Sequence, residues 1–190
     1  MDIAVINRSV EAYKRHHNMR LASREIGIPL STLYVHLKRA GVAVVGDKSK
    51  YGTDKDRFAC KAEREFERII PSAENQNKVK FQSKIDFMIG EYSVDVKASR
   101  LRSSGCGANV LRWAYSVKKQ EFCADFFVCF GFDNAGLKLE NILLIPGEVA
   151  RMYATISVSP RGGKWLDYQV TEQELHDFFV QMMEIPKEQP

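Results

Sequence analysis

Two short stretches of alternating apolar and polar residues, on either side of Gly90-Glu91, constrain the fold of this 190-residue chain more than any other feature. The first reads IDFMI and the second reads YSVDVK. Alternation with a period of two is typical of a half-buried β-strand, and a two-residue connection that includes glycine is typical of a β-hairpin. A turn at Gly90-Glu91 sets Ile89 opposite Tyr92 and, further out, Asp86 opposite Asp95. The sequence therefore predicts a hairpin that brings two carboxylates face to face.

The predicted hairpin has one apolar face and one polar face. The apolar face carries Ile85, Phe87, Ile89, Val94 and Val96, and the polar face carries Lys84, Asp86, Met88, Ser93, Asp95 and Lys97. Directly opposed carboxylates lie with their Cβ atoms roughly 4.5–5.5 Å apart and repel each other. Mg²⁺ relieves that repulsion because it prefers carboxylate oxygens. Since Lys97 projects from the same face as Asp95, the pattern predicts a magnesium site with an ammonium beside it. The alternative is an ordinary surface hairpin with one ion pair.

The spacing of these three residues, D-x8-D-x-K, resembles the core motif of the PD-(D/E)XK nuclease family. Ile85 stands where that motif commonly has proline, and Asp95 stands where glutamate is commoner. Upstream, AEREFERII at residues 62–70 resembles the helix that precedes the motif in Holliday-junction resolvases of the family. By that match Glu63 is the expected acid from the helix. Glu67 lies one turn further on the same face and is the second candidate, whereas Glu65 lies on another face.

This resemblance implies a site, a cofactor and a fold. It implies that Mg²⁺, with Mn²⁺ as a substitute, is held by the carboxylates of Glu63, Asp86 and Asp95 and the carbonyl of Val96. Lys97 would then position the attacking water, and Lys118 and Gln120 would lie near the phosphate. The implied fold is α/β, with a restriction-endonuclease-like core in which helices flank a mixed central sheet. Cleavage of both DNA strands needs two such sites, so a homodimer acting on double-stranded DNA is expected.

The N-terminal end of the chain has the charge and pattern of a DNA-binding element. Its first 50 residues contain nine Lys and Arg against four Asp and Glu, although the net charge of the whole chain is only +4. The segment at residues 19–42 predicts two short helices separated by Gly27, with Pro29 near the start of the second. It resembles the helix-turn-helix of bacterial and phage DNA-binding proteins. The residues expected to face DNA are Ser31, Thr32, Val35, His36, Lys38 and Arg39. A three-helix bundle that contacts another protein is the alternative.

The remaining patterns divide the chain into a helix-turn-helix domain at residues 1–45, a polar linker at 46–54 and a nuclease domain at 55–190. Within the last we expect helices at about 55–70 and 108–122 and strands at ADFFVCFGF, NILLIP and ATISVS. Thr171 and Glu174 form a capping-box pattern that predicts a last helix. A mobile loop between the strand YSVDVK and the second of these helices would contact the DNA backbone through Arg100 and Arg102, with a solvated loop as the alternative.

Composition narrows the class of protein and its setting. No apolar run approaches the ~20 residues that span a bilayer, and the cysteines lack zinc-ligand spacing. We therefore expect a cytoplasmic protein of a bacterial or phage-infected cell, with reduced thiols. The favoured function is a sequence-specific DNA endonuclease of the restriction or homing type. A structure-specific Holliday-junction resolvase is the first alternative. A non-catalytic DNA-binding regulator with a dimerising core is the second.

Overall fold

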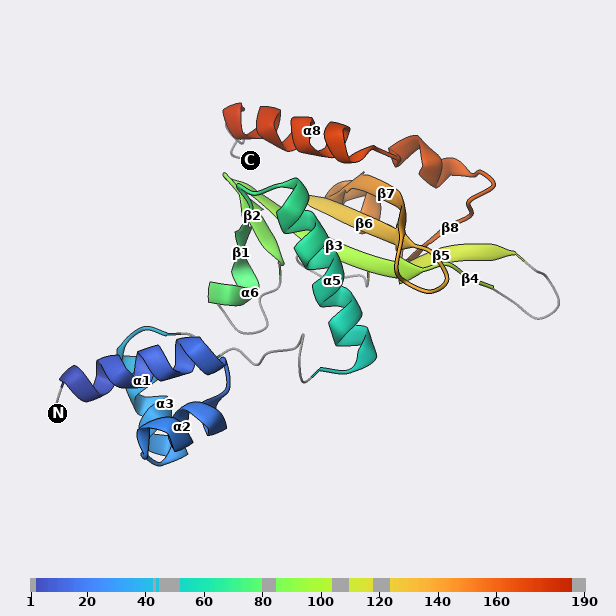
Figure 1. Cartoon of the computed structure of the whole chain (residues 1–190). Coiled ribbons are helices and arrows are strands. Elements are labelled where there is room, and N and C mark those ends of the chain that lie inside the picture. Colours follow the sequence, from blue (N-terminus) through green and yellow to red (C-terminus); the bar gives the residue numbers. More distant parts are fainter. Residues whose placement is uncertain are drawn as a thin grey trace.

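The computed structural model describes residues 3–42, 44, 52–79, 85–103, 110–117 and 124–185 of the chain. These residues form a group of three helices near the N-terminus and a larger body of mixed α/β structure (Figure 1). The α/β class and the mixed sheet predicted from the sequence are confirmed. None of the described helices is both long and apolar enough to cross a membrane.

The three N-terminal helices pack around a small core of their own. They are α1 (Ile3–His16), α2 (Met19–Ile26) and α3 (Leu30–Arg39), and we call them the head. Asn18 caps α2 by accepting hydrogen bonds from two backbone N–H groups, and Gly27 ends α2 in the left-handed region at φ 70°. The buried members of the head core are Ala12, Tyr13, Ala22, Leu33 and Leu37. Ala22, whose small side chain allows neighbouring helices to approach closely, lies in this core.

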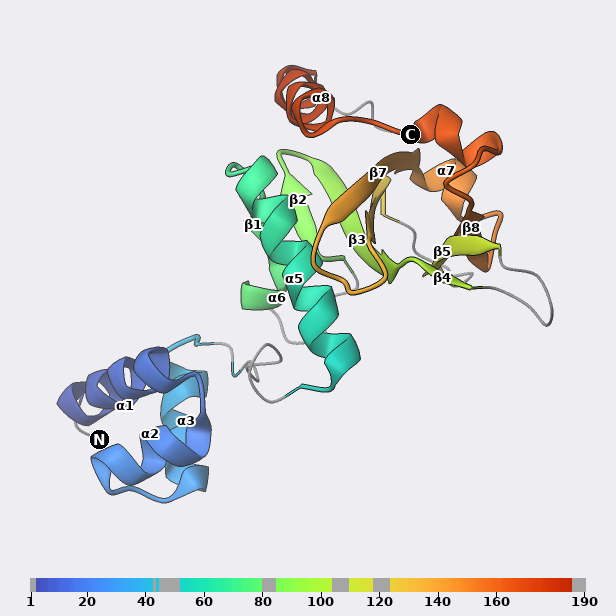
Figure 2. The same cartoon turned by 45° about the vertical axis from the view of Figure 1, so that its right-hand side comes forward.

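The body is organised by a five-stranded mixed sheet with the order β1-β2-β3-β6-β7 (Figure 2). Its strands are β1 (Glu74–Asn75), β2 (Phe87–Ile89), β3 (Tyr92–Arg100), β6 (Phe126–Phe132) and β7 (Leu139–Pro146). β3 and β6 run parallel, and the other neighbouring pairs run antiparallel. β6 and β7 correspond to the apolar runs ADFFVCFGF and NILLIP, so both predicted strands are confirmed.

A second, three-stranded sheet corrects one of the predicted helices. It has the order β4-β5-β8, with β4 (Arg102–Ser103), β5 (Leu111–Ser116) and β8 (Thr155–Val158). The helix expected at 108–122 is wrong, because its described part contains β5. Trp113 and Tyr115 are buried there while Leu111, Ala114 and Ser116 are exposed. Burial at every second residue is the period of a strand.

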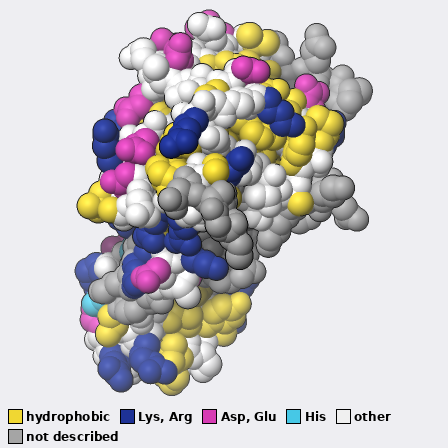
Figure 3. All heavy atoms as spheres, turned by 90° about the vertical axis from the view of Figure 1, so that its right-hand side faces the viewer, with side chains coloured by type: hydrophobic (Ala, Val, Ile, Leu, Met, Phe, Trp, Pro, Cys, Tyr) yellow, Lys and Arg dark blue, Asp and Glu magenta, His cyan; other side chains and the backbone are white. Residues whose placement is uncertain are grey.

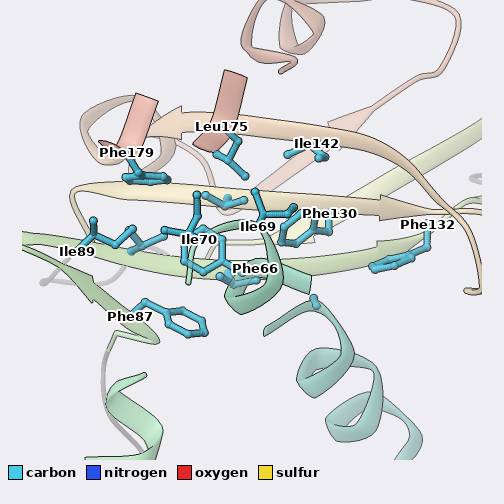
Figure 4. Close-up of a cluster of buried hydrophobic side chains, with 14 residues drawn as sticks. Phe66, Ile69, Ile70, Phe87, Ile89, Phe130, Phe132, Ile142, Leu175 and Phe179 are labelled. Carbon is cyan, nitrogen blue, oxygen red and sulfur yellow. The ribbon is translucent and has the colours of Figure 1, made fainter. Parts of the chain in front are cut away.

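Two hydrophobic clusters cover opposite faces of the five-stranded sheet. Side chains alternate between them along β6, where Val128 and Phe130 enter one cluster and Phe127 and Cys129 the other. The first cluster lies between the sheet and two helices, α5 (Asp54–Ile69) and α8 (Glu172–Glu184) (Figure 4). The second is closed by β5 and β8, by α7 (Gly147–Ala150) and by the 3-10 helix η1 (Lys164–Tyr168).

The two long helices of the body begin at capping boxes. Thr171 and Glu174 form the predicted one at the start of α8. Thr53 and Asp56 form another at the start of α5, which begins one residue before the predicted position and ends just before Pro71. One further short helix, α6 (Gln76–Val79), follows β1 and leads toward the hairpin. Both β1 and α6 lie against β2.

Candidate active site

The hairpin has the register that the sequence predicted. Ile89 pairs with Tyr92, Met88 with Ser93 and Phe87 with Val94. Gly90 adopts φ 56° at the turn, a conformation that glycine reaches without strain. The side chains of Phe87, Ile89, Val94 and Val96 are buried in the cluster beneath α5 and α8. Ile85 is the exception, because it packs against the cluster on the opposite face. The strict alternation therefore ends where the chain passes Asp86.

Asp86 lies at the point where β2 leaves β3. Its N–H donates to the carbonyl of Val94 at 3.1 Å, and its own carbonyl accepts from the N–H of Gln76 at 2.8 Å. The Asp86 carboxylate then turns toward β3, where Oδ2 accepts from the N–H of Val96 at 2.8 Å. Asp86 is thus not a ladder partner of Asp95 in the manner expected. Its carboxylate instead accepts from the Val96 backbone N–H at the place where β2 has ended.

The Val96 backbone faces this same gap in the sheet. Within a β-strand the N–H and C=O of one residue point to the same side of the strand. Because the Val96 N–H meets Asp86, the Val96 carbonyl also points away from β6, toward the side that β2 has left. The sequence analysis expected the Val96 carbonyl to bind Mg²⁺ together with Asp86 and Asp95, and this is the direction that such a ligand needs.

The carboxyl groups of Asp86 and Asp95 interact directly, and Lys97 lies against the second of them. Lys97 Nζ is 2.5 Å from Asp95 Oδ2, and the side chains of the two residues are 27% and 14% exposed. Burial raises the pKa of the Asp95 carboxyl to about 7. The Lys97 ammonium opposes that rise, and the hydrogen-bonded carboxyl of Asp86 adds to it. Without a further cation, the site holds more carboxylate charge than its surroundings favour.

The floor of the site is apolar. Lys97 Nζ lies 5.9 Å from the centroid of the Phe127 ring, and the adjacent strand residue Cys129 is fully buried. Burial raises the pKa of the Cys129 thiol well above its usual range, so that thiol stays protonated. Cys129 is accordingly a packing residue, as expected for a reduced thiol in the core.

A second set of hydrogen bonds joins Asp86 to helix α5, and the sequence analysis missed it. Asn77 Nδ2 donates to Asp86 Oδ1 at 3.1 Å, and the Asn77 N–H donates to Asn75 Oδ1 at 3.0 Å. Asn75 Nδ2 in turn donates to Glu67 Oε1 at 2.9 Å. The polar run ENQN, just before the strand region, was the only signal of this network in the sequence. We call it the asparagine relay.

The helix acids are only partly where the sequence placed them. Glu67, the second candidate, is the one that the asparagine relay connects to Asp86. Glu63 lies one turn earlier on the same flank and is half-buried. Within the part of the chain that the structure describes, no three Asp, Glu, His or Cys residues are gathered closely enough to hold a metal ion. The expected set of Glu63, Asp86 and Asp95 is therefore not assembled here. Glu65 pairs with Arg68 at 2.9 Å on another face, as predicted.

In the head, α3 presents most but not all of the residues expected to face DNA. Ser31, Val35, Lys38 and Arg39 are exposed and Thr32 is half-buried. His36 is a correction: it is only 4% exposed, and its Nδ1 lies 2.8 Å from Ser9 Oγ on α1. His36 follows Leu33 by one turn and adjoins Leu37, so the α3 geometry directs it into the head core. Tyr34, which the sequence analysis missed, is 44% exposed on the outer face, with Lys38 Nζ 6.0 Å from its ring centroid.

The basic residues of the predicted loop also divide. Arg100 is a correction, because it is the last residue of β3 and its guanidinium lies 4.5 Å from the centroid of the Phe58 ring, against α5. Arg102 is exposed on β4, where it pairs with Arg112 across the strand ladder. Lys118 and Gln120 lie outside the described residues. Lys and Arg side chains lie in both the upper and the lower part of the face drawn in Figure 3, so basic charge on that face is not confined to one end.

Comparison with known proteins adds no family to these observations. No family model matches the chain, and neither a curated protein nor a solved structure matches it. Inference about its function therefore depends on the geometry and chemistry of its own residues.

Proposed function

We propose that this chain is a Mg²⁺-dependent DNA endonuclease whose active site is formed by Asp86, Asp95 and Lys97. The observation that carries the proposal is the direct contact of two half-buried carboxyl groups at a gap in the sheet, with one lysine beside them. A purely structural ion pair needs a single acid for Lys97. The second acid adds repulsion and burial cost, which a divalent cation would offset.

The donor atoms at this site fit Mg²⁺. The carboxylates of Asp86 and Asp95 and the carbonyl of Val96 all offer oxygen ligands, and Asp86 interacts with both Asp95 and the Val96 backbone. Mg²⁺ and Mn²⁺ both suit carboxylate and carbonyl ligands. A bound Mg²⁺ would supply Lewis acidity, which polarises a phosphate and lowers the pKa of a coordinated water. Glu63 or Glu67 would complete the set only if α5 or its side chains shift on binding.

The residues of the chain itself would do the positioning. Asp86 is fixed by donors on both of its oxygens, from Val96 and from Asn77. Asp95 holds the Lys97 ammonium next to the acid pair. Lys97 keeps a partly exposed side chain with three N–H donors, so it can orient a water and stabilise negative charge that develops on phosphoryl oxygens. The family resemblance implies products with 5′-phosphate and 3′-hydroxyl ends.

The head favours a sequence-specific enzyme within this class. The exposed surface of α3 combines hydroxyl, apolar, aromatic and basic side chains, which is the composition that reads base edges in a major groove. A nuclease without sequence preference would have no use for such a surface. Cleavage of both strands would require two copies of the site, and hence a homodimer on double-stranded DNA in the cell's soluble compartment.

Cleavage of a mixed plasmid library and of a synthetic four-way junction, each with Mg²⁺ or Mn²⁺, tests this function. We expect discrete cuts in the plasmids, none by Asp95→Asn and normal cutting by the exposed-acid control Glu148→Gln. Cutting of the junction alone would replace the proposal with a junction resolvase. Specific DNA binding without cleavage under either metal would replace it with a non-catalytic regulator.

A further inference from the structure

We infer that Asn77 is a positioning residue for the metal site, and that the asparagine relay couples α5 to the acid pair. This inference rests on the proposed function and deepens it. Asn77 Nδ2 reaches Asp86 Oδ1 at 3.1 Å while the Val96 N–H reaches Asp86 Oδ2 at 2.8 Å. Val96 and Asn77 thus hold one carboxylate oxygen each, which fixes the plane of the carboxylate. An ionised carboxylate has about four lone-pair sites, so these two donors leave room for a cation where Asp86 now interacts with Asp95.

The orientation of each side-chain amide in the relay follows from its partners. Glu67 is an acceptor when ionised, so Asn75 must present its NH₂ group to Glu67 and its oxygen to the backbone N–H of Asn77. Asp86 is likewise an acceptor, so Asn77 must present its NH₂ group to it. One assignment of oxygen and nitrogen satisfies all three contacts. The relay therefore has a fixed direction: both side-chain NH₂ groups donate to carboxylates, and the Asn75 side-chain oxygen accepts from the Asn77 backbone N–H.

The hydrogen bonds of the asparagine relay also hold the backbone between β1 and α6. The Asn75 side chain accepts from the N–H two residues along, a local turn that positions the start of α6. The Gln76 N–H donates to the Asp86 carbonyl at 2.8 Å, so the same turn also holds the Asp86 backbone. Asn77 consequently reaches Asp86 from a segment that is itself anchored on Glu67 of α5. Partners of this kind around a metal ligand typically change metal affinity about 10–100-fold when removed.

Substitutions at Asn77 separate positioning from simple support of the fold. Asn77→Ala removes the donor and should weaken Mn²⁺ binding about 10-fold. Asn77→Asp removes the same donor but places a third carboxylate beside Asp86, so it should strengthen Mn²⁺ binding relative to the natural chain because affinity rises with ligand charge. A residue that merely supports the fold would shift both variants in the same direction. Asn75→Ala, which leaves Asp86 untouched, should weaken binding by a smaller factor than Asn77→Ala.

The experiment titrates the full-length chain with Mn²⁺ and follows free Mn²⁺ by electron paramagnetic resonance, with thermal unfolding as a check on folding. Asn134→Ala, an exposed asparagine, is the matched control. Loss in Asn77→Ala and gain in Asn77→Asp supports the inference. If Asn77→Asp does not fold, a loss in Asn77→Ala with a smaller loss in Asn75→Ala supports it instead.

Two outcomes would overturn this inference, and they differ from failure of the proposed function. Mn²⁺ affinity equal to that of the natural chain in both folded Asn77 variants would exclude a positioning role while leaving the metal site intact. Equal weakening in Asn77→Ala and Asn77→Asp would reduce Asn77 to a structural residue. Failure of the proposed function has a different signature: Asp95→Asn would bind Mn²⁺ as well as the natural chain does.

Discussion

The head and the body build their candidate functional surfaces in opposite ways. In the head, the outer face of α3 is exposed, and the helix packs on a core of five buried residues. In the body, Asp86, Asp95 and Lys97 are half-buried and held by hydrogen bonds from the backbone and from Asn77. Recognition tolerates mobile, exposed side chains, whereas chemistry needs groups fixed before the substrate arrives. The two functions should therefore be separable by substitution.

Loss of Lys97 is the change with the largest expected effect. Lys97→Ala should lower the cleavage rate by about 10²–10³-fold, the typical effect of removing one group that stabilises developing charge. DNA affinity should stay the same, because α3 is untouched. Gel-based cleavage and fluorescence-anisotropy binding measure the two quantities, and Lys138→Ala is the exposed-lysine control. Normal turnover in Lys97→Ala would contradict the proposed active site, and with it the contrast between a recognition surface in the head and a catalytic site in the body.

Removal of the head should have the next largest effect. A chain that begins at residue 46 should lose site preference and bind DNA at least ~10-fold more weakly, because specific contacts separate specific from non-specific affinity. Metal-dependent cutting should persist at scattered positions, since the acid pair and Lys97 remain. Sequencing of the cut ends from a plasmid library measures both properties. An unchanged pattern of cut sites would show that the head serves another purpose.

Two neighbouring residues of α3 sharpen the comparison within the head itself. Tyr34→Ala should weaken DNA binding by about 5–10-fold, equivalent to the ~1–1.5 kcal/mol of one good contact, and leave thermal stability unchanged. His36→Ala should destabilise the head by about 1–3 kcal/mol, because it removes a buried side chain and one of the two hydrogen bonds of Ser9, whose hydroxyl still donates to the Val5 carbonyl. Thermal unfolding and binding at low temperature distinguish them. A reversed pattern, with His36 governing affinity and Tyr34 governing stability, would contradict the observed orientation of α3.

The pH dependence of stability in the absence of metal should reveal the raised pKa of the Asp95 carboxyl in the body. The Asp95 pKa rises in the folded state to about 7, mainly because the carboxyl is buried. Such a group binds its proton more tightly when folded, so metal-free stability should fall as pH rises from about 4 to about 7 and stay low above that. Asp95→Asn should raise the melting temperature at pH 8 by a few degrees and have little effect at pH 5. Equal shifts at both pH values would contradict the raised pKa.

The sequence predicted the hairpin better than it predicted the head, for a physical reason. A strand has a side-chain period of two, so a turn at Gly90-Glu91 fixed which face every residue from Phe87 to Val96 would occupy. A helix has a broad buried stripe, and a residue at its edge can fall on either side. His36 lies at such an edge, and its partner Ser9 is 27 residues away in the chain. Local periodicity holds no information about that contact.

The remaining differences also come from contacts between distant residues. Asp86 leaves the ladder because Gln76 and Asn77 bind it, and neither follows from the alternation of the hairpin. Arg100 stacks on Phe58, which lies 42 residues earlier in the chain, on α5. β5 is different, because Leu111, Trp113 and Tyr115 already recur at every second residue, which is the period of a strand. The helix prediction overlooked this local signal. For Asp86 and Arg100, in contrast, the tertiary partner decided the local structure.

The most direct test of the proposed metal site is a crystal structure of the full chain with Mn²⁺, located by its anomalous scattering. We expect one Mn²⁺ ion bound by carboxylate oxygens of both Asp86 and Asp95, at distances of about 2.1 Å, comparable to those of Mg²⁺. Lys97 should then lie free of its present contact with Asp95 and face the open side of the ion. An acid pair that stays without an ion at saturating Mn²⁺, with Lys97 still paired to Asp95, would contradict the proposal that this site is catalytic.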